Sequence, residues 1–380
     1  MYIKYFATNR DQENLGRDIE RKTRIELQKG GYNWIDAQKY MSHYLATTDP
    51  TRMTTDAIVK SSKETIFDGF LKNPKIKRIV ICVHGFNVHL HGALTSFSIL
   101  TDTLEETKTK LGQGLIVDPS QIAKKENLND LTAVVGFSWP SNGRVCDYKS
   151  DRLEAISSAA ALANLISAIK SHCPRVEVHI IAHSMGNFLV CNMLKSLVNY
   201  ESLPCNFADN EELKSKLELE IGRRGEREGA NSHFFVDSYI MLAPDVERRH
   251  VTQCNKSEDD PQHTKASYIG PFYGGLHHLV GGTYLFYSRY DQALKASKLE
   301  KEVFRENKLR GITDIFTGPD LENLWEDSLG LNPAPNLAPS NFYSFNASTL
   351  SNRPIDHGDY FDTPAIAQKI SEIILNYQTD

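Results

Sequence analysis

The stretch VEVHIIAHSMGNFLVCNML, residues 176–194, places a serine between an apolar run and a helix-like run. The first run, Val176–Ile181, is rich in β-branched residues, which is typical of a buried parallel strand. The run after Gly186 has apolar residues at helical spacing. A strand that turns directly into a helix turns sharply, and small residues two positions before and after the apex keep the backbones apart. Ala182 and Gly186 occupy those positions, so the pattern predicts a nucleophile elbow with Ser184 at its apex.

A serine nucleophile needs two N–H donors aimed at the oxyanion of its tetrahedral intermediate. The run VICVHGFN, Val80–Asn87, ends an early strand in His84-Gly85. The residue after the nucleophile, Met185, is expected to supply one donor. Phe86 in the loop after this strand is expected to supply the other, with Asn87 as the next candidate. We expect His84 to brace the loop rather than to act as a base.

The catalytic base is expected near the C-terminus. His357 is the only one of the thirteen histidines beyond residue 278, and it lies in NRPIDHGDYFD, after the last predicted strand. The elbow fold has its triad in the order serine, acid, histidine, which His357 satisfies.

The acid is expected just past a strand end, where YLFYSRYDQAL places Asp291 and LAPDVE places Asp245. The usual position after the later strand favours Asp291, with Asp245 as the alternative acid or as a structural carboxylate.

The composition limits the class of protein. With 380 residues, of which 40% are hydrophobic and 24% charged, the chain has the composition of a soluble globular protein. A net charge of −5 gives no basis for nucleic-acid binding. No apolar run approaches the length of a membrane span, and the N-terminus lacks the apolar core of a secretory signal. The six cysteines are scattered without a C-x-x-C pair, which favours reduced thiols and a cytoplasmic location.

Strand-like runs alternate with helix-like runs along the chain, so we expect a mostly parallel central sheet with helices on both faces. The clearest strands are predicted at Ile79–Val83, Thr132–Ser138, Val176–Ile181, Phe234–Leu242, Thr283–Tyr287 and Phe342–Phe345. An edge strand is expected at Tyr2–Ala7. Helices are predicted over Arg152–Lys170 and from Pro364 to Tyr377, the second capped by Asp362 or Thr363.

Several motifs together resemble one family. They are Phe6–Arg10, His84–Asn87, Ser138–Gly143, Tyr148 with Asp151–Arg152, His183–Asn187, Ala243–Asp245, Ser288–Leu294, and His357 with Tyr360 and Phe361. Over nearly its whole length the chain resembles bacterial α/β-hydrolases of unknown function, an esterase- or lipase-like group. The resemblance implies the α/β-hydrolase fold and a Ser–His–Asp triad, and it supplies no substrate. Ala182 in place of the first elbow glycine and the long gap between Asp291 and His357 depart from the family pattern.

The predicted organisation is a single α/β-hydrolase domain over residues 1–380 with insertions at about 205–232, 247–282 and 299–340. Such insertions are either solvated decoration or lid elements, because loops at the strand C-termini surround the site. Within 247–282 five glycines are candidate hinges of a lid: Gly270, Gly274, Gly275, Gly281 and Gly282. The apolar residues among them either form a wall for an acyl chain or belong to the core: Phe272, Tyr273, Leu276, Leu279 and Val280.

The leading hypothesis is a serine hydrolase that acts on a small-molecule carboxylic ester, a lipid ester or another acyl substrate. The alternatives are amide or thioester hydrolysis, an acyltransferase, and a catalytically inactive binding or scaffolding protein. No cofactor and no metal are expected. A metal site on His263, His277 and His278 is disfavoured, because adjacent histidines rarely point at one ion from regular structure. Arg10 is expected either to bind an anionic group or to brace the site loops.

Overall fold

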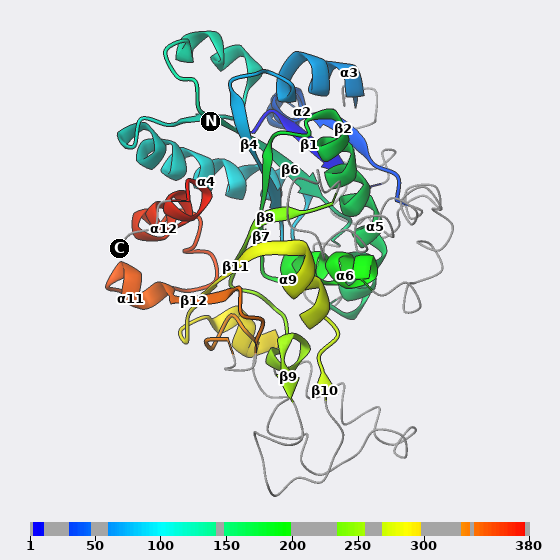
Figure 1. Cartoon of the computed structure of the whole chain (residues 1–380), viewed down its shortest axis with the longest axis vertical. Coiled ribbons are helices and arrows are strands. Elements are labelled where there is room, and N and C mark those ends of the chain that lie inside the picture. The colour runs from blue at the N-terminus through cyan, green and yellow to red at the C-terminus, as the bar shows by residue number, and fades with distance from the viewer. Residues whose placement is uncertain are drawn as a thin grey trace, which may run out of the picture.

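The computed structural model describes residues 3–10, 30–46, 60–141, 148–198, 234–254, 268–297, 328–334 and 338–376 (Figure 1). Its strands are β1 (Tyr5–Thr8), β2 (Asn33–Asp36), β3 (Lys60–Ser61), β4 (Ile76–Val83), β5 (Gly114–Ile116), β6 (Leu131–Ser138), β7 (Glu177–His183), β8 (Val236–Leu242), β9 (Gln253–Cys254), β10 (Tyr268–Ile269), β11 (Val280–Tyr287) and β12 (Phe342–Asn346). Within this part of the chain a ten-stranded sheet runs in the order β12-β11-β8-β7-β4-β6-β1-β2-β3, and β5 pairs with β6 beside this path. Strands β9 and β10 form a separate antiparallel pair.

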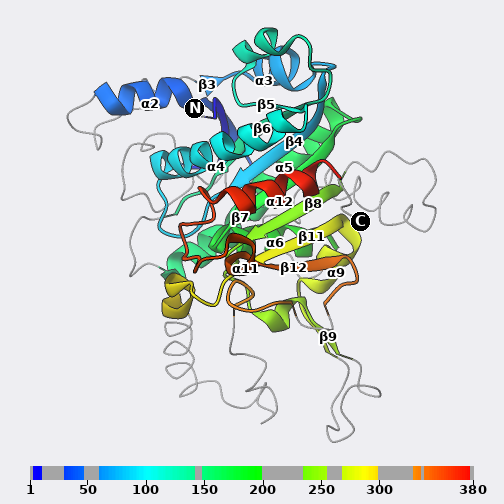
Figure 2. The same cartoon turned by 90° about the vertical axis from the view of Figure 1, so that its left-hand side faces the viewer.

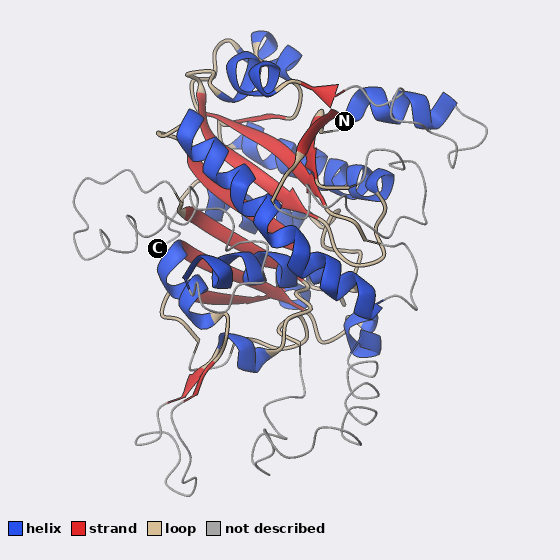
Figure 3. Ribbon diagram, turned by 90° about the vertical axis from the view of Figure 1, so that its right-hand side faces the viewer, coloured by secondary structure: helices blue, strands red, loops and turns tan. Residues whose placement is uncertain are grey.

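Helices cover both faces of the sheet. They are α2 (Ala37–Ala46), α3 (Lys63–Ile66), α4 (Leu90–Lys110), α5 (Tyr148–His172), α6 (Met185–Val198), α9 (Tyr273–Leu279), α11 (Ala347–Ser351) and α12 (Pro364–Ile374), with the shorter turns η4 (Phe67–Leu71), η5 (Pro119–Gln121), η6 (Ala123–Lys125) and η9 (Arg248–Val251). Figure 2 looks onto the face that α4 and α12 cover. Figure 3 shows the opposite face, which α5 and α6 cover. The mostly parallel sheet with helices on both sides is as predicted.

The pairing of β1 corrects the expectation of an edge strand at Tyr2–Ala7. Strand β1 pairs in parallel with β6 on one side and antiparallel with β2 on the other, so it lies inside the sheet. Antiparallel β2 and β3 extend the sheet beyond it. These two strands have four and two residues, which is too short to produce the alternating pattern by which strands are predicted.

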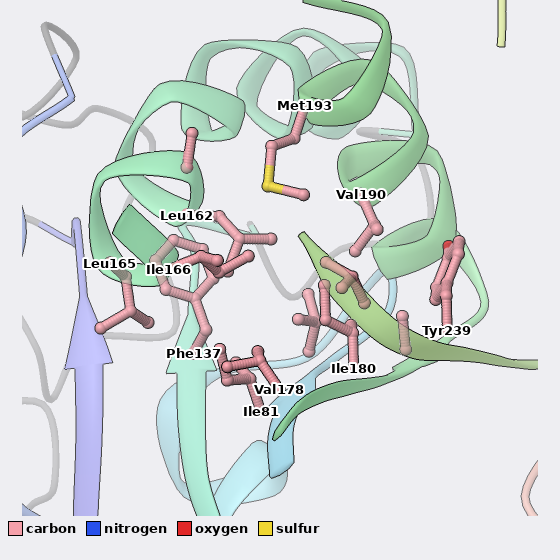
Figure 4. Close-up of a cluster of buried hydrophobic side chains, with 14 of the residues drawn as sticks. Ile81, Phe137, Leu162, Leu165, Ile166, Val178, Ile180, Val190, Met193 and Tyr239 are labelled. Carbon is pink, nitrogen blue, oxygen red and sulfur yellow. The ribbon is translucent and has the colours of Figure 1, made fainter. Parts of the chain in front are cut away.

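The two faces of the central strands pack into separate cores. Along β4, Ile79, Ile81 and Val83 belong to one cluster and Val80 and Cys82 to the other, because successive side chains of a strand point to opposite faces. Burial on both faces explains why these strands are continuous apolar runs. Figure 4 shows the α5 and α6 side, where strand and helix side chains interlock: Ile81, Phe137, Leu162, Leu165, Ile166, Val178, Ile180, Val190, Met193 and Tyr239. Each large aliphatic side chain buried in this way stabilises the fold by about 2 kcal/mol.

Helix α5 corrects one expectation about apolar runs. By length and composition alone, Ser150–His172 is long and apolar enough to cross a membrane. However, 67% of its apolar window is buried inside the fold. Leu162, Leu165 and Ile166 on its inner face pack on the sheet (Figure 4), which is the arrangement of a core helix.

The final helix begins at Pro364 as predicted and ends at Ile374, before Tyr377. Its N-cap residue is Thr363, but the side chain of Thr363 makes no capping hydrogen bond. The Thr363 hydroxyl instead donates to the carbonyl of Asp359 at 2.5 Å. The predicted cap position is therefore confirmed, whereas the predicted side-chain cap is wrong.

The predicted insertions lie partly outside the described residues. All of 205–232, residues 255–267, and residues 299–327 and 335–337 are among those not described, so the lid hypothesis stays a prediction. In the described part of 247–282, Phe272, Leu276, Leu279 and Val280 are buried in the core beside α6, so they form no acyl-chain wall. A Cβ on Gly275 would lie 2.7 Å from the backbone of Leu194. This glycine permits close packing of α9 on α6.

Candidate active site

The strand order reverses at β4, because β6 lies on one side of it and β7 on the other. In open α/β sheets, ligands bind outside the C-terminal ends of the strands at such a point. The loop after β4 begins at His84, and β7 leads directly into Ser184. The predicted nucleophile and the predicted oxyanion loop therefore meet at the edge of the sheet where a ligand is expected.

Ser184 has the backbone of a nucleophile elbow. Its φ of 52° lies in the left-handed region, between the end of β7 and the start of α6. The N–H of Ser184 donates to the carbonyl of Leu242 at 3.0 Å, which ties the turn to β8. The carbonyl of Ser184 accepts from the N–H of Asn187 at 3.1 Å and from that of Asp245 at 3.2 Å. Hydrogen bonds on both sides therefore hold the strained residue in place.

Strained backbone gathers at this edge of the sheet. Asn87, Ser184 and Ala243 have φ values of 57°, 52° and 43°, and they follow β4, β7 and β8 respectively. Such a conformation costs of order 1–3 kcal/mol for a residue with a side chain, and it persists where surrounding contacts enforce it. The cluster marks these three strand ends as a candidate functional site.

Small residues let the elbow approach the β4 loop. A Cβ on Gly186 would overlap the carbonyl oxygen of His84, and one on Gly85 would lie 2.8 Å from the Cβ of Ser184. Helix α6 therefore starts directly against the end of β4. Ala182, the departure from the family pattern, is fully buried in the core on the α5 and α6 side, so its methyl group is accommodated.

Asn187 is an elbow residue whose role the sequence did not reveal. Its side-chain Nδ2 donates to the carbonyls of Ala182 and Ser184 at 3.1 Å and of Leu242 at 3.2 Å. Its Oδ1 accepts from the hydroxyl of Tyr239 at 2.9 Å. An asparagine inside an apolar helical run was the signal available in the sequence, since a polar group that is buried needs partners.

The predicted base and acid are in contact. The Nδ1 atom of His357 lies 2.7 Å from Oδ2 of Asp291, whose side chain is fully buried. Because a carboxylate accepts, Nδ1 carries the proton and Nε2 is left free to accept one. Asp291 is fixed in turn by the N–H of Leu294, which donates to Oδ1 at 2.9 Å. The imidazole of His357 lies beside the elbow, with its ring centroid 4.5 Å from that of His183.

Asp245 has a different set of partners. Its carboxylate accepts hydrogen bonds from the hydroxyls of Tyr148 at 2.6 Å, Ser297 at 2.9 Å and Ser328 at 3.2 Å. Asp245 is buried, and its N–H supports the carbonyl of Ser184. Of the two candidate acids, Asp291 is the one in contact with His357, whereas Asp245 joins three chain segments behind the elbow.

The two predicted oxyanion donors are Phe86 and Met185. Within the described part of the chain, neither of their N–H groups donates to a protein acceptor. Met185 is the first residue of α6, where N–H groups have no partner in the helix. The ring of Phe86 packs edge-on against Tyr148, with ring centroids 5.4 Å apart. The role of these two N–H groups as oxyanion donors stays a prediction.

His84 braces the loop after β4. Its Nε2 accepts from the N–H of Trp139 at 3.1 Å, and its Nδ1 lies 3.0 Å from the carbonyl of Gly85. The imidazole stacks on the Trp139 indole with ring centroids 5.2 Å apart. Burial, and then the charge of Arg10, hold the pKa of His84 well below its usual value, so the ring stays neutral. These contacts fit a bracing role and not that of a base.

Arg10 serves the same loop from β1. Its Nε donates to the hydroxyl of Ser138 at 2.8 Å, and its Nη2 donates to the carbonyl of Val88 at 2.8 Å. The side chain is buried. Of the two expectations for Arg10, the structure shows the bracing contacts.

Among the described residues, no group of three or more histidine, cysteine, aspartate or glutamate side chains is arranged to hold a metal ion. His277 and His278 are exposed on α9, and His263 lies outside the described residues.

A serine at a strand–helix elbow, followed along the chain by an acid and a histidine in contact, is the arrangement of the α/β-hydrolase class. The chain belongs to the family of alpha/beta hydrolases of unknown function (DUF900), whose model matches residues 59–353. The uncharacterized protein alr1448 of Nostoc sp. (strain PCC 7120 / SAG 25.82 / UTEX 2576) is 54% identical over 380 residues, which are 100% of this chain and 95% of that protein. The family and fold implied by the sequence motifs are confirmed.

Solved structures with a detectable likeness include two proteins. Aspergillus fumigatus lipase B is 14% identical with a TM-score of 0.32, and the match covers 78% of this chain and 51% of that chain. This chain therefore spans about half the length of that lipase. The product of gene lin2722 from Listeria innocua is 9% identical with a TM-score of 0.34, over 80% of this chain and 96% of that one.

Proposed function

We propose that this protein is a serine hydrolase that cleaves a carboxylic ester or related acyl substrate through an acyl-enzyme. Ser184 is the nucleophile, His357 the general base and Asp291 the orienting acid. The observation that carries the proposal is the 2.7 Å contact between His357 Nδ1 and the buried Asp291 carboxylate, beside an elbow that holds Ser184 at a φ of 52°. That combination is the requirement for an activated serine.

In the proposed acylation step, Nε2 of His357 takes the Ser184 hydroxyl proton as Oγ attacks the substrate carbonyl carbon. Asp291 holds the proton on Nδ1 and stabilises the imidazolium that forms. The N–H groups of Phe86 and Met185 stabilise the negative charge on the carbonyl oxygen. His357 then protonates the leaving alcohol, and the acyl group stays on Ser184.

In the proposed deacylation step, His357 removes a proton from water, which attacks the acyl-enzyme carbonyl. The carboxylic acid leaves and Ser184 recovers its proton from His357. An alcohol in place of water would give acyl transfer, so acyltransferase activity belongs to the same chemistry. A lipid ester remains one candidate substrate.

The proposed location is the cytoplasm. Among the described residues, Cys82, Cys173 and Cys191 are free and buried. Burial raises the pKa of the Cys173 thiol to about 11. Unpaired, protonated thiols support a reducing compartment.

Hydrolysis of short p-nitrophenyl esters by the full chain tests the proposal. We expect saturable hydrolysis that Ser184→Ala reduces to the uncatalysed rate, with an unchanged thermal melting curve. Addition of a second alcohol separates acyl transfer from hydrolysis, because transfer forms a new ester. Activity retained in Ser184→Ala would mean another nucleophile. Absence of both hydrolysis and transfer would favour a binding protein with this fold.

A further inference from the structure

Side chains form hydrogen bonds with both the carbonyl and the N–H of the His357 backbone. The carbonyl of His357 lies 2.9 Å from Nε2 of His183, the residue directly before the nucleophile. A carbonyl oxygen can only accept, so Nε2 of His183 carries the proton and donates. The residue before Ser184 is therefore bonded to the backbone of the proposed base.

The surroundings of His183 fix its ring and its protonation state. The ring is buried, and its centroid lies 4.7 Å from that of Phe361 and 6.4 Å from that of Tyr360. Burial, and then the charge of His357, hold the pKa of His183 well below its usual value. The neutral ring carries a single proton, and the carbonyl of His357 requires that proton on Nε2.

The N–H of His357 is held from the opposite side. Oδ1 of Asp356 accepts it at 2.8 Å, and the same oxygen accepts the N–H of Gln292 at 2.9 Å. Gln292 directly follows Asp291. One carboxylate oxygen thus joins the backbone of the proposed base to the turn that carries the proposed acid. The N–H of Gln292, followed by that of His357, lowers the pKa of Asp356, which keeps the carboxylate ionised and able to accept.

Packing anchors the residues on either side of His357, because Ile355 and Tyr360 are fully buried, but His357 itself is only partly buried. The His357 side chain is 23% exposed. Gly358, the next residue, has no side chain, and a Cβ added there would meet nothing within 4 Å. Hydrogen bonds to the His357 backbone therefore act together with the ring contact to His183 to set where the imidazole lies between the elbow and the acid.

We propose that His183 and Asp356 are positioning residues that fix the His357 backbone, His183 to the nucleophile elbow and Asp356 to the Asp291 turn. The proposal rests on the proposed function. Neither side chain takes part in proton transfer. Both act by keeping Nε2 of His357 in reach of Ser184 and Nδ1 in reach of Asp291. A displacement of about 1 Å in such a group lowers the rate by about 10²-fold.

Two pairs of variants test the proposal by steady-state ester hydrolysis. His183→Leu removes the donor and keeps an apolar side chain, whereas the amide of His183→Gln can still donate. Asp356→Ala removes the acceptor, whereas the amide oxygen of Asp356→Asn can accept both N–H groups. We expect His183→Leu and Asp356→Ala to lower kcat by about 10²-fold with KM nearly unchanged. The conservative variants His183→Gln and Asp356→Asn should keep most of the natural kcat. Asp362→Ala, at an exposed carboxylate of the same loop, is the matched control and should leave kcat unchanged.

Proton NMR provides a second measurement, which does not depend on ester hydrolysis. The Nδ1 proton of His357, hydrogen-bonded to Asp291, is expected to give a signal far downfield in the full chain. We expect His183→Leu and Asp356→Ala to weaken or shift this signal, and the conservative variants and Asp362→Ala to keep it. If the natural protein hydrolyses no ester but the signal follows this order, the proposed function fails and the positioning role stands.

Unchanged kcat and an unchanged signal in both His183→Leu and Asp356→Ala would overturn the proposal. Thermal melting identifies variants that have lost their fold. If His183→Leu does not fold, the comparison of Asp356→Ala with Asp356→Asn tests the proposal. Asp356 is exposed, so replacing it leaves the core intact.

Discussion

Asp291 and Asp245 follow neighbouring strands of the sheet, yet their carboxylates have different partners. Asp291 lies 2.7 Å from Nδ1 of His357, whereas Asp245 accepts three hydroxyl groups. An acid that orients a histidine must contact that histidine. A carboxylate buried among hydroxyls supports the surrounding segments instead. Removing the charge of Asp291 should therefore affect catalysis, whereas removing the charge of Asp245 should mainly affect stability.

We expect Asp291→Asn to lower kcat by about 10⁴-fold, because an amide NH₂ on Nδ1 favours the wrong tautomer of His357. Asp245→Asn should lower kcat much less and should reduce the melting temperature, because one amide oxygen replaces the two acceptors of the carboxylate. Ester hydrolysis and thermal melting of both variants check this. The reverse ranking of kcat would make Asp245 the acid.

Single residues differ in how far the sequence could identify them. Ser184 follows from small neighbours between a strand and a helix, and His357 from its place after the last strand. The choice between Asp291 and Asp245 stayed open, because both follow strand ends and only the fold shows which carboxylate meets the histidine. The roles of Asn187 and His183 depend on bonds to other segments, which no local pattern encodes.

At the scale of elements, the elbow depends on α6 and β8 being joined by the Asn187 amide. We expect Asn187→Leu to lower the free energy of unfolding by about 1–3 kcal/mol, because the Tyr239 hydroxyl and several carbonyls lose a partner. Asn192→Leu on the same helix is the control, since Asn192 donates only to the carbonyl of Phe188 among its described contacts. Urea unfolding measures both, and equal losses would show that the elbow does not depend on Asn187.

Helix α4 carries a buried lysine against the sheet. Lys108 is fully buried, and its Nζ donates to the hydroxyl of Thr132 at 3.2 Å. Burial, and then the charge of Arg78, lower its pKa to about 7, against the opposing effect of Asp130 and Glu105. The unfolded chain keeps the usual value of 10.5. Between these two values the unfolded state binds more protons than the folded state, so stability rises with pH across that window.

We expect Lys108→Met to flatten the rise in unfolding free energy between pH of about 7 and about 10, because no proton is then released on folding at this position. Lys110→Met, at an exposed lysine of the same helix, should leave the slope as it is. Urea unfolding at several pH values measures the slope. An unchanged slope in Lys108→Met would show that Lys108 does not titrate between these limits.

Strands were predictable from the sequence where successive residues are buried on both faces of the sheet. The strands β4, β6, β7 and β8 are apolar on both faces, so their runs stand out in the sequence. The short strands β2 and β3 give no comparable run, and without them β1 was placed at the edge. Residues 298–327 lie outside the described residues.

At the scale of the whole molecule, the site stands on the most buried part of the sheet. Strands β4 and β7 have a core on each face, whereas β12 forms one end of the sheet and has exposed residues. We expect amide hydrogen exchange to be slowest in β4 and β7 and faster in β12, because central strands open only when the whole domain unfolds. Exchange followed by mass spectrometry measures this. Faster exchange in β4 than in β12 would contradict the architecture.

The sequence predicted the order of the triad along the chain but not its assembly. Asp291 and His357 are 66 positions apart, and the segment between them departs from the family pattern. Parallel strands bring their C-terminal ends to one edge, which is why residues after β7, β11 and β12 can meet. The 2.7 Å contact and the hydrogen bonds that support it required the structure.

Active-site labelling of the full chain with a fluorophosphonate, mapped by mass spectrometry, tests the central claim most directly. The reagent reacts with a serine that has an adjacent base and an oxyanion hole, and it needs no knowledge of the natural substrate. We predict a single adduct on Ser184 that is absent in Ser184→Ala and forms much more slowly in His357→Gln. A folded protein that forms no adduct, or forms one on another residue, would contradict the assignment of Ser184 as an activated nucleophile.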